Sequence, residues 1–216
     1  MSKLIVDISM SLDGYVAGPD QTLDEPLGRG GNLLHEWAFA TRSWQESHGM
    51  SGGEPGADSD LVDEHVSRAG ATIMGRRMFS GGEGPWESDP NADAWWGDEP
   101  PFHHPVFVLT HHARERLTKK GGTTFTFVTD GAESALEQAR AAAGQKDVAV
   151  AGGGEAVQQY LGAGLVDELQ VHVAPVLLGG GARLFGDLPD APAGLECTRS
   201  LGSPSGVAHL RYEPVR

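Results

Sequence analysis

The sequence has a single cysteine, Cys197, and only 16 lysines and arginines against 30 aspartates and glutamates. One cysteine excludes an internal disulfide and fits a reducing cytoplasm. The net charge of −14 argues against nucleic acid and anionic membrane surfaces as partners, because both are themselves negatively charged. Long hydrophobic runs are also missing, and the apolar stretch after Lys3 is too short for a signal peptide or a membrane span. We therefore expect a cytoplasmic protein.

Several common motifs are missing as well. No Gly-Lys-Ser/Thr follows a glycine turn, which excludes a P-loop nucleotide site. The Rossmann fingerprint is incomplete, because Val157 takes the place of its third glycine. The serines of 202–206 lie between two strand-like runs, so they do not form the nucleophile turn of a hydrolase. The pairs at 103–104 and 111–112 predict no metal site, because adjacent side chains on a strand point to opposite faces.

The sequence does contain strands that end at glycine. Residues 148–152 form a short apolar run that stops at Gly152, Gly153 and Gly154, and a helical pattern follows. Glycines let the backbone approach a ligand closely, and the free N–H groups of the next helix favour an anion. This stretch predicts either a phosphate-binding turn or a plain turn without a ligand.

A second junction has the same form. The apolar strand 71–75 ends at Gly75, and a helix begins with Arg76 and Arg77. Cations are unfavourable near a helix N-terminus, so the two arginines indicate an anion beside them, unless they are simply solvated. Two such turns could hold the two phosphates of one dinucleotide. A third strand ends at Thr110, and ligands of open α/β sheets lie beyond the carboxyl ends of the strands.

Strands and helices alternate along most of the chain. We expect strands at 4–9, 71–75, 106–110, 124–128, 148–152 and 165–176, helices at 60–69, 132–143 and after 154, and an antiparallel pair at 197–201 and 207–212. This order predicts one α/β domain over 1–216, with helices on both faces of a mixed, mostly parallel sheet. Cys197, on an apolar strand, is expected to be buried and inert.

Two long loop excursions, at about 19–59 and 80–105, interrupt this order. They are rich in aromatic residues, which need partners to pack against. Trp37, Trp86 and Trp96 are candidates to stack on a flat heterocyclic substrate, although each is equally consistent with plain core or with an interface.

Taken together and in order, the motifs resemble a known family. The matching residues are Ser11-Leu12-Asp13-Gly14-Tyr15-Val16-Ala17-Gly18, Ile73-Met74-Gly75-Arg76-Arg77, Val108-Leu109-Thr110, Gly152-Gly153-Gly154-Glu155, and the run from Gly164-Leu165-Val166-Asp167-Glu168-Leu169 through Pro175 to Gly181. They resemble the reductase (C-terminal) domain of the bifunctional riboflavin-biosynthesis deaminase-reductase in its stand-alone form, a relative of dihydrofolate reductase. The deaminase half is absent, because its Pro-Cys-x-x-Cys motif needs two cysteines.

The resemblance implies a fold, a cofactor and a set of site residues. The fold is the dihydrofolate reductase-like three-layer α/β/α sandwich with an antiparallel C-terminal hairpin. The activity is NADPH-dependent hydride transfer to a pterin-like or ribosylamino-pyrimidine-like heterocycle, by a homodimer. The implied cofactor residues are Ser9, Val16 and Ala17 at the nicotinamide, then Gly75, Arg76, Arg77, Met78, Leu109, Thr110 and His111 at the phosphates and adenine ribose, and Gly152, Gly153, Gly154, Glu155, Ala156 and Val157 at the pyrophosphate and nicotinamide ribose.

Two positions bear on how far the resemblance extends. Glu155 stands where dihydrofolate reductases often carry an arginine toward the 2′-phosphate, which weakens the preference for NADP over NAD. The carboxylate that holds the pterin in those enzymes falls at Asp60, our candidate proton donor, but an acid at a helix start also stabilises the helix by itself. The alternative is a non-catalytic NADP(H)-binding protein with a degenerate substrate pocket.

Overall fold

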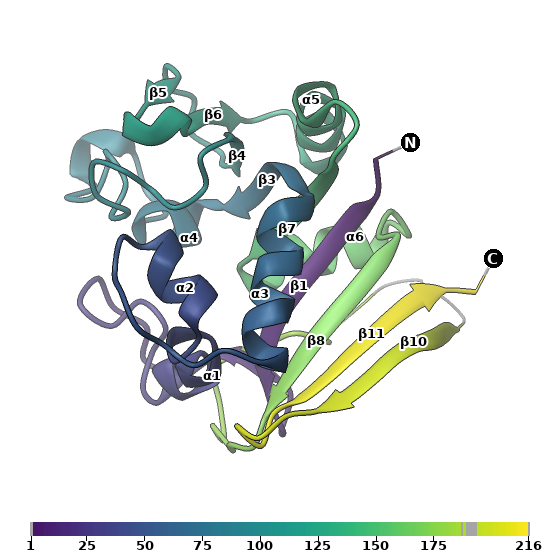
Figure 1. Ribbon diagram of the computed structural model, residues 1–216. Helices are drawn as coiled ribbons and strands as arrows, with labels where there is room; N and C mark the ends of the chain where they lie inside the picture. Colours follow the sequence, from purple (N-terminus) through teal and green to yellow (C-terminus); the bar gives the residue numbers. More distant parts are fainter. Residues whose placement is uncertain (1, 187, 189–193, 216) are drawn as a thin grey trace.

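The computed structural model describes residues 2–186, 188 and 194–215 and is organised around a nine-stranded sheet (Figure 1). The strand order is β10-β11-β8-β1-β7-β3-β4-β6-β5. Its parallel centre consists of β8 (Glu168–Ala174), β1 (Leu4–Ser11), β7 (Asp147–Gly152), β3 (Ala69–Gly75), β4 (Pro105–Leu109) and β6 (Thr124–Val128).

Both edges of the sheet are antiparallel. The hairpin of β10 (Leu195–Gly202) and β11 (Ala208–Pro214) joins the sheet beside β8, and β5 (Leu117–Thr118) pairs with β6. A separate ribbon is formed by β2 (Tyr15–Ala17) and β9 (Ala182–Arg183). The predicted fold class, a mostly parallel sheet with a C-terminal hairpin, is confirmed.

Helices cover both faces of the sheet. In Figure 1, α3 (Ala57–Arg68) lies in front of it, and α5 (Ala132–Ala143) and α6 (Gly154–Gly162) lie behind it. The short helices are η1 (Gly31–Leu34), α1 (Glu36–Phe39), α2 (Arg42–Ser47), α4 (Arg76–Ser80), η2 (Trp86–Ser88) and η3 (Lys120–Gly122). None of the helices in the described part of the chain is long and apolar enough to cross a membrane.

The two faces of the sheet carry different side chains. Along β1, Leu4, Val6 and Ile8 point into the apolar core that α5 and α6 cover. The residues between them face α3, and there β1 places Asp7 and β8 places Glu168, because side chains alternate along a strand. One face is therefore apolar, and the face under α3 carries buried polar groups.

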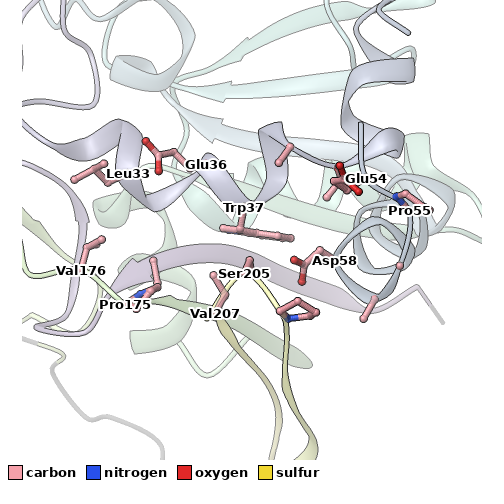
Figure 2. Close-up of a pocket in the computed structure, with 16 residues that line it drawn as sticks. Leu33, Glu36, Trp37, Glu54, Pro55, Asp58, Pro175, Val176, Ser205 and Val207 are labelled. Atoms are coloured by element: carbon pink, nitrogen blue, oxygen red, sulfur yellow. The ribbon is translucent and has the colours of Figure 1, made fainter. Parts of the chain in front are cut away.

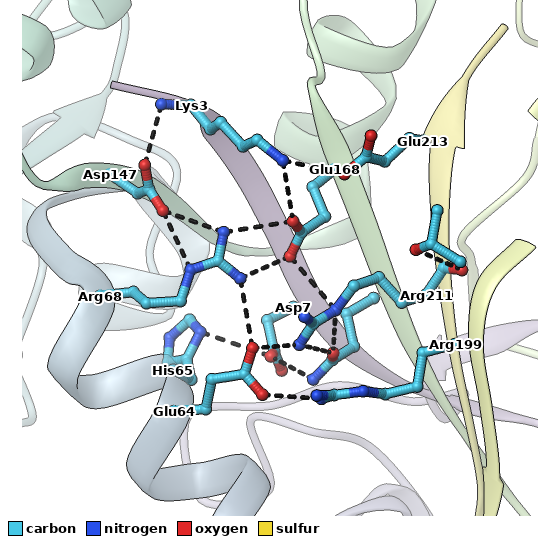
Figure 3. Close-up of polar contacts among 12 residues, drawn as sticks. Lys3, Asp7, Glu64, His65, Arg68, Asp147, Glu168, Arg199, Arg211 and Glu213 are labelled. Carbon is cyan, nitrogen blue, oxygen red and sulfur yellow. Dashed lines mark hydrogen bonds and ion pairs between the residues drawn. The ribbon is translucent and has the colours of Figure 1, made fainter. Parts of the chain in front are cut away.

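Ion pairs fasten α3 to this polar face (Figure 3). Arg68 of α3 pairs with Asp147 at 2.9 Å and with Glu168 at 2.6 Å. Arg211 of β11 pairs with Glu64 of α3 at 2.6 Å and with Glu168 at 3.3 Å. The Glu168 side chain is 6% exposed, so its charge depends on these cations for stabilisation.

Three predicted details were wrong. Helix α3 begins at Ala57 after Gly56, three residues before the predicted start at residue 60, and Ser59 is a buried residue inside it whose hydroxyl lies 2.6 Å from that of Ser43. The predicted strand 165–176 is shorter, because the chain becomes a strand only at Glu168. Cys197 is exposed, because β10 is the outermost strand of the sheet and most of its side chains face solvent.

Candidate active site

The carboxyl ends of neighbouring parallel strands form the edge on which the site is built. In the strand register Met74 pairs with Gly152, and Gly75 pairs with Leu109. Thr110 follows at the end of β4, where its N–H donates to the Val128 carbonyl at 3.1 Å. Neighbouring strands are about 4.8 Å apart, so the predicted gathering of Gly75, Thr110 and Gly153 on one edge is confirmed.

The backbone of this edge is open between β3 and β7. A Cβ built on Gly75 would lie 3.6 Å from the Gly153 nitrogen, and a Cβ on Gly153 would meet no described atom within 4 Å. Helix α6 begins after Gly153, and no side chain of the described residues caps it. Its first N–H groups can therefore bind an anion.

The two arginines of the second junction already have protein partners. Arg76 is buried, pairs with Asp89, which is 2% exposed, and stacks 3.5 Å from the centre of the Trp86 ring. Burial raises the pKa of Asp89, but its hydrogen bonds with Ser80 and Arg76 outweigh burial and lower that pKa. The sequence predicts an anion beside these arginines, and for Arg76 the protein itself supplies it.

Arg77 is different, because its side chain is 55% exposed. It pairs with the exposed carboxylates of Glu83 and, at 4.0 Å, Glu155. Glu155 is itself 84% exposed, so this cation stays accessible to a ligand. Of the two arginines, Arg77 is the one that can reach an anion in solvent.

The remaining predicted cofactor residues lie around the same edge. The His112 N–H donates to the Thr110 hydroxyl at 3.1 Å, and the side chain of His111 is exposed. The Met78 sulfur lies 3.5 Å from where a Gly152 Cβ would stand. Residues in or beside the first turn of α6 and at the ends of β1 and β2 are buried: Ala156, Val157, Gly154, Ser9, Val16 and Ala17.

A pocket of about 600 Å³ opens at the carboxyl end of β8 (Figure 2). Trp37 of α1, Asp58 of α3, Val176 and Val207 are among the residues that line it. The Trp37 indole N–H donates to the Ser9 hydroxyl at 3.0 Å. Strand β1 lies between β8 and β7, so Ser9 of β1 lies between this pocket and the strand end at Gly152.

Two residues that were expected to contact the substrate, Asp60 and Trp86, lie outside the lining of this pocket. Asp60 is exposed and lies outside the pocket lining, which instead contains Asp58. Residues two apart on a helix point to different sides, so the first turn of α3 presents only one of these acids to the pocket. Trp86 packs against Phe79 and donates its indole N–H to the His112 carbonyl at 2.8 Å, beyond the β4 end of the edge.

Sequence reasoning missed a buried chain of polar side chains under Trp37. Asp7 contacts His172, His172 contacts His209, and His209 contacts Asp58. Burial raises the pKa of Asp7, but His172 and His65 outweigh burial and hold that pKa well below its usual range. The available signal was a charged or imidazole residue at an inward position of an otherwise apolar strand.

Burial and the nearby His172 also lower the pKa of His209, so this histidine gives up a proton readily. No group of three or more His, Cys, Asp or Glu side chains in the described ranges is arranged to hold a metal ion. The arrangement instead suits proton transfer, because each ring nitrogen of the pair lies within hydrogen-bonding distance of another group.

Comparisons with known proteins agree with this architecture. The model of the RibD C-terminal domain family matches residues 2–208. No curated protein matches the sequence. A structure from Shewanella sp. PV-4 assigned to riboflavin biosynthesis is similar, with 23% identity, a TM-score of 0.64 and 99% of each chain covered.

Two further structures share the fold at lower identity. A pyrimidine reductase-like protein from Corynebacterium diphtheriae has 14% identity and a TM-score of 0.57, covering 100% of this chain and 92% of its own. The diaminohydroxyphosphoribosylaminopyrimidine deaminase/5-amino-6-(5-phosphoribosylamino)uracil reductase of Thermotoga maritima has 13% identity and a TM-score of 0.55. The match covers 99% of this chain and 57% of that longer protein.

Proposed function

This chain belongs to the RibD C-terminal domain family, and from that premise we propose that it is an NADPH-dependent reductase of a pyrimidine-type or pterin-like heterocycle. The observation that carries the proposal is the row of Gly75, Thr110 and Gly153 on one sheet edge, beside a pocket with a carboxylate. The Thermotoga relative is named as a reductase of a phosphoribosylamino-uracil, which supports the pyrimidine class of substrate.

The open edge fits a dinucleotide. A pyrophosphate would lie against Gly153 and the N–H groups of α6, where a Cβ would project into open space. Arg77 would hold the 2′-phosphate, since its charge is accessible. Ser9, Val16 and Ala17 would flank the nicotinamide, between the glycine turn and the pocket. The reduced nicotinamide supplies a hydride when bound.

Within the pocket the side chains of the protein have separate tasks. The Trp37 indole and Val207 form apolar walls that exclude water from the reacting atoms. Asp58 holds a carboxylate at the pocket surface and is 18% exposed. It replaces Asp60 as the proposed proton donor, because only a group within reach of the substrate can transfer a proton to it.

The charge of the pocket restricts the substrate further. Its lining includes the acids Glu36, Glu54 and Asp58, whereas no lysine or arginine of the described residues lines it. A phosphate placed there would be repelled by like charges. We therefore propose that the heterocycle bound in this pocket carries no phosphate group.

A turnover assay tests the proposal. The purified protein is incubated with NADPH and a panel of pterins, dihydrofolate and ribosylamino-pyrimidines with and without their phosphate, while the absorbance of the reduced nicotinamide is followed. We expect oxidation with an unphosphorylated heterocycle, and a loss of kcat of about 100-fold in Asp58→Asn. Asp60→Asn is the matched control and should retain its rate. NADPH binding without turnover of any substrate would favour the non-catalytic binding protein.

A further inference from the structure

Four side chains form a continuous hydrogen-bonded chain beneath Trp37. His172 Nε2 lies 2.8 Å from Asp7 Oδ1, His172 Nδ1 lies 2.6 Å from His209 Nδ1, and His209 Nε2 lies 2.8 Å from Asp58 Oδ1. The two imidazoles are 2% and 1% exposed. The chain thus runs from a half-buried acid on β1 to the acid that lines the pocket.

The sheet holds these residues in place. His209 stands directly opposite His172 in the antiparallel pair of β11 and β8, and Asp7 lies on the neighbouring strand β1. The Trp37 ring covers both imidazoles, with ring centres 4.5 Å and 5.0 Å apart. Because the imidazoles are covered, protons enter or leave the chain through its two carboxylates, Asp7 and Asp58, which are 19% and 18% exposed.

The contacts constrain how many protons the chain holds when both of its carboxylates are ionised. An ionised carboxylate only accepts hydrogen bonds, so Asp7 and Asp58 each require a proton on the facing Nε2. The two Nδ1 atoms lie 2.6 Å apart, so they share one proton. Two protons between them would clash, and without a proton the two nitrogen lone pairs would face each other. Together His172 and His209 therefore carry a single positive charge between two carboxylates.

Other groups around the chain keep its far end ionised. Gln170 Nε2 donates to Asp7 Oδ2 at 2.9 Å, and His65 Nδ1 of α3 lies 3.4 Å from the same oxygen. The Arg211 guanidinium donates a hydrogen bond to the side-chain amide oxygen of Gln170 at 2.6 Å. His35, beside α1, has its pKa lowered to about 4 by burial and by His172, so it stays neutral near neutral pH.

We propose that Asp7, His172, His209 and Asp58 form a relay that delivers the proton of the reduction, a role that depends on the proposed reductase function. The His209 Nε2–H bond breaks as Asp58 receives that proton and passes one to the nitrogen of a substrate C=N bond. When bound, the reduced nicotinamide would supply the hydride to the carbon and be oxidised, so that C=N becomes CH–NH. His209 is left neutral, and its Nδ1–H still donates to His172. A proton from solvent then restores the charge.

The catalytic test replaces the histidine next to the pocket. His209→Gln keeps a donor toward Asp58 but cannot release a proton. We expect kcat to fall by about 100-fold with KM little changed, and the solvent deuterium isotope effect on kcat to increase. His104→Gln is the matched control, because this histidine contacts the Thr72 hydroxyl and lies outside the relay. If His209→Gln is folded and keeps the rate and isotope effect of the parent, the relay is wrong.

A second measurement does not depend on activity. Nitrogen NMR of the ¹⁵N-histidine-labelled protein, without cofactor, should show both Nε2 atoms of His172 and His209 protonated and their Nδ1 atoms sharing one proton. A deprotonated Nε2 on either ring near neutral pH would overturn the relay. Lack of reductase activity in the parent protein, with the shared proton present, would instead overturn the proposed function alone.

Discussion

The two halves of the carboxyl edge differ in what they present to a ligand. Between β7 and β4 the chain presents backbone, with Gly153 exposed and Gly75 half-buried beside it. Between β1 and β11 it presents buried side chains, from Asp7 through the two histidines to Asp58. We call these the glycine half and the histidine half. The first suits a ligand common to many enzymes, whereas the second suits one particular reaction.

The halves also differ in what keeps them folded. The glycine half needs little from distant residues, because its turns are set by consecutive residues between a strand and a helix. The histidine half depends on α3 lying in one position over the sheet, and ion pairs on buried and half-buried carboxylates hold it there. Substitutions in the histidine half should therefore affect stability more than those in the glycine half.

The largest effect should come from Glu168, which holds α3 over the histidine half. Glu168→Gln leaves Arg68 and Arg211 without their buried carboxylate, and the free energy of unfolding should fall by about 3–5 kcal/mol. Asp98→Asn removes an exposed pair with Lys120 and should leave the free energy of unfolding almost unchanged, because solvent screens exposed ion pairs. Urea denaturation measures both. Equal losses would show that the ion pairs do not fasten the helix.

Within the glycine half, we expect Arg76 to contribute to stability and Arg77 to contribute to cofactor binding. Arg76→Met leaves Asp89 buried without its cation, so we expect about 3 kcal/mol of lost stability. Arg77→Met should leave stability unchanged and weaken NADPH binding about 10-fold, because an accessible charge is lost. NADH binding is the control. An equal loss for both cofactors would refute the 2′-phosphate assignment to Arg77.

The glycine half can be blocked without unfolding it. A Cβ on Gly75 would make only ordinary contacts, the nearest at 3.6 Å, but it would occupy space proposed for the cofactor. Gly75→Ala should therefore weaken dinucleotide binding about 10-fold, equally for NADPH and NADH. Gly202→Ala, in the hairpin with open space around it, should bind normally. Unchanged affinity in Gly75→Ala would place the dinucleotide elsewhere.

The glycine half was the part that the sequence allowed us to predict. Its motifs are runs of consecutive residues, and the parallel strands bring Gly75, Thr110 and Gly153 together without further information. Likewise Ala132–Ala143 was predicted with its correct bounds, because its residues favour helix throughout. The homodimer and the use of NADPH remain predictions.

The histidine half could not be predicted, because its members come from separate elements. Asp58 joins His209 only once α3 lies over the hairpin, and no spacing in the sequence encodes that contact. The error at Asp60 has the same origin, since the side of the helix that faces the pocket depends on how α3 packs. Arg76 likewise resembled a ligand-binding residue, because its partner Asp89 lies in a loop.

The smallest expected effect concerns a half-buried histidine outside both halves. His104 Nε2 lies 2.7 Å from the Thr72 hydroxyl, no carboxylate of the described residues is paired with it, and burial lowers its pKa to about 4. The unfolded chain, with a histidine pKa of about 6.5, binds more protons than the folded one as pH falls from about 6.5 toward about 4. The stability that neutral His104 contributes is therefore complete above about pH 6.5 and is lost on acidification.

His104→Gln lacks this titration and keeps a polar group beside Thr72. Between about pH 7 and about pH 5 the parent protein should lose about 1 kcal/mol more stability than the variant, a value reduced for partial exposure of the ring. Urea midpoints at the two pH values measure the difference. Parallel losses in both proteins would mean that His104 is already charged in the folded protein near neutral pH, and that its partial burial does not lower its pKa.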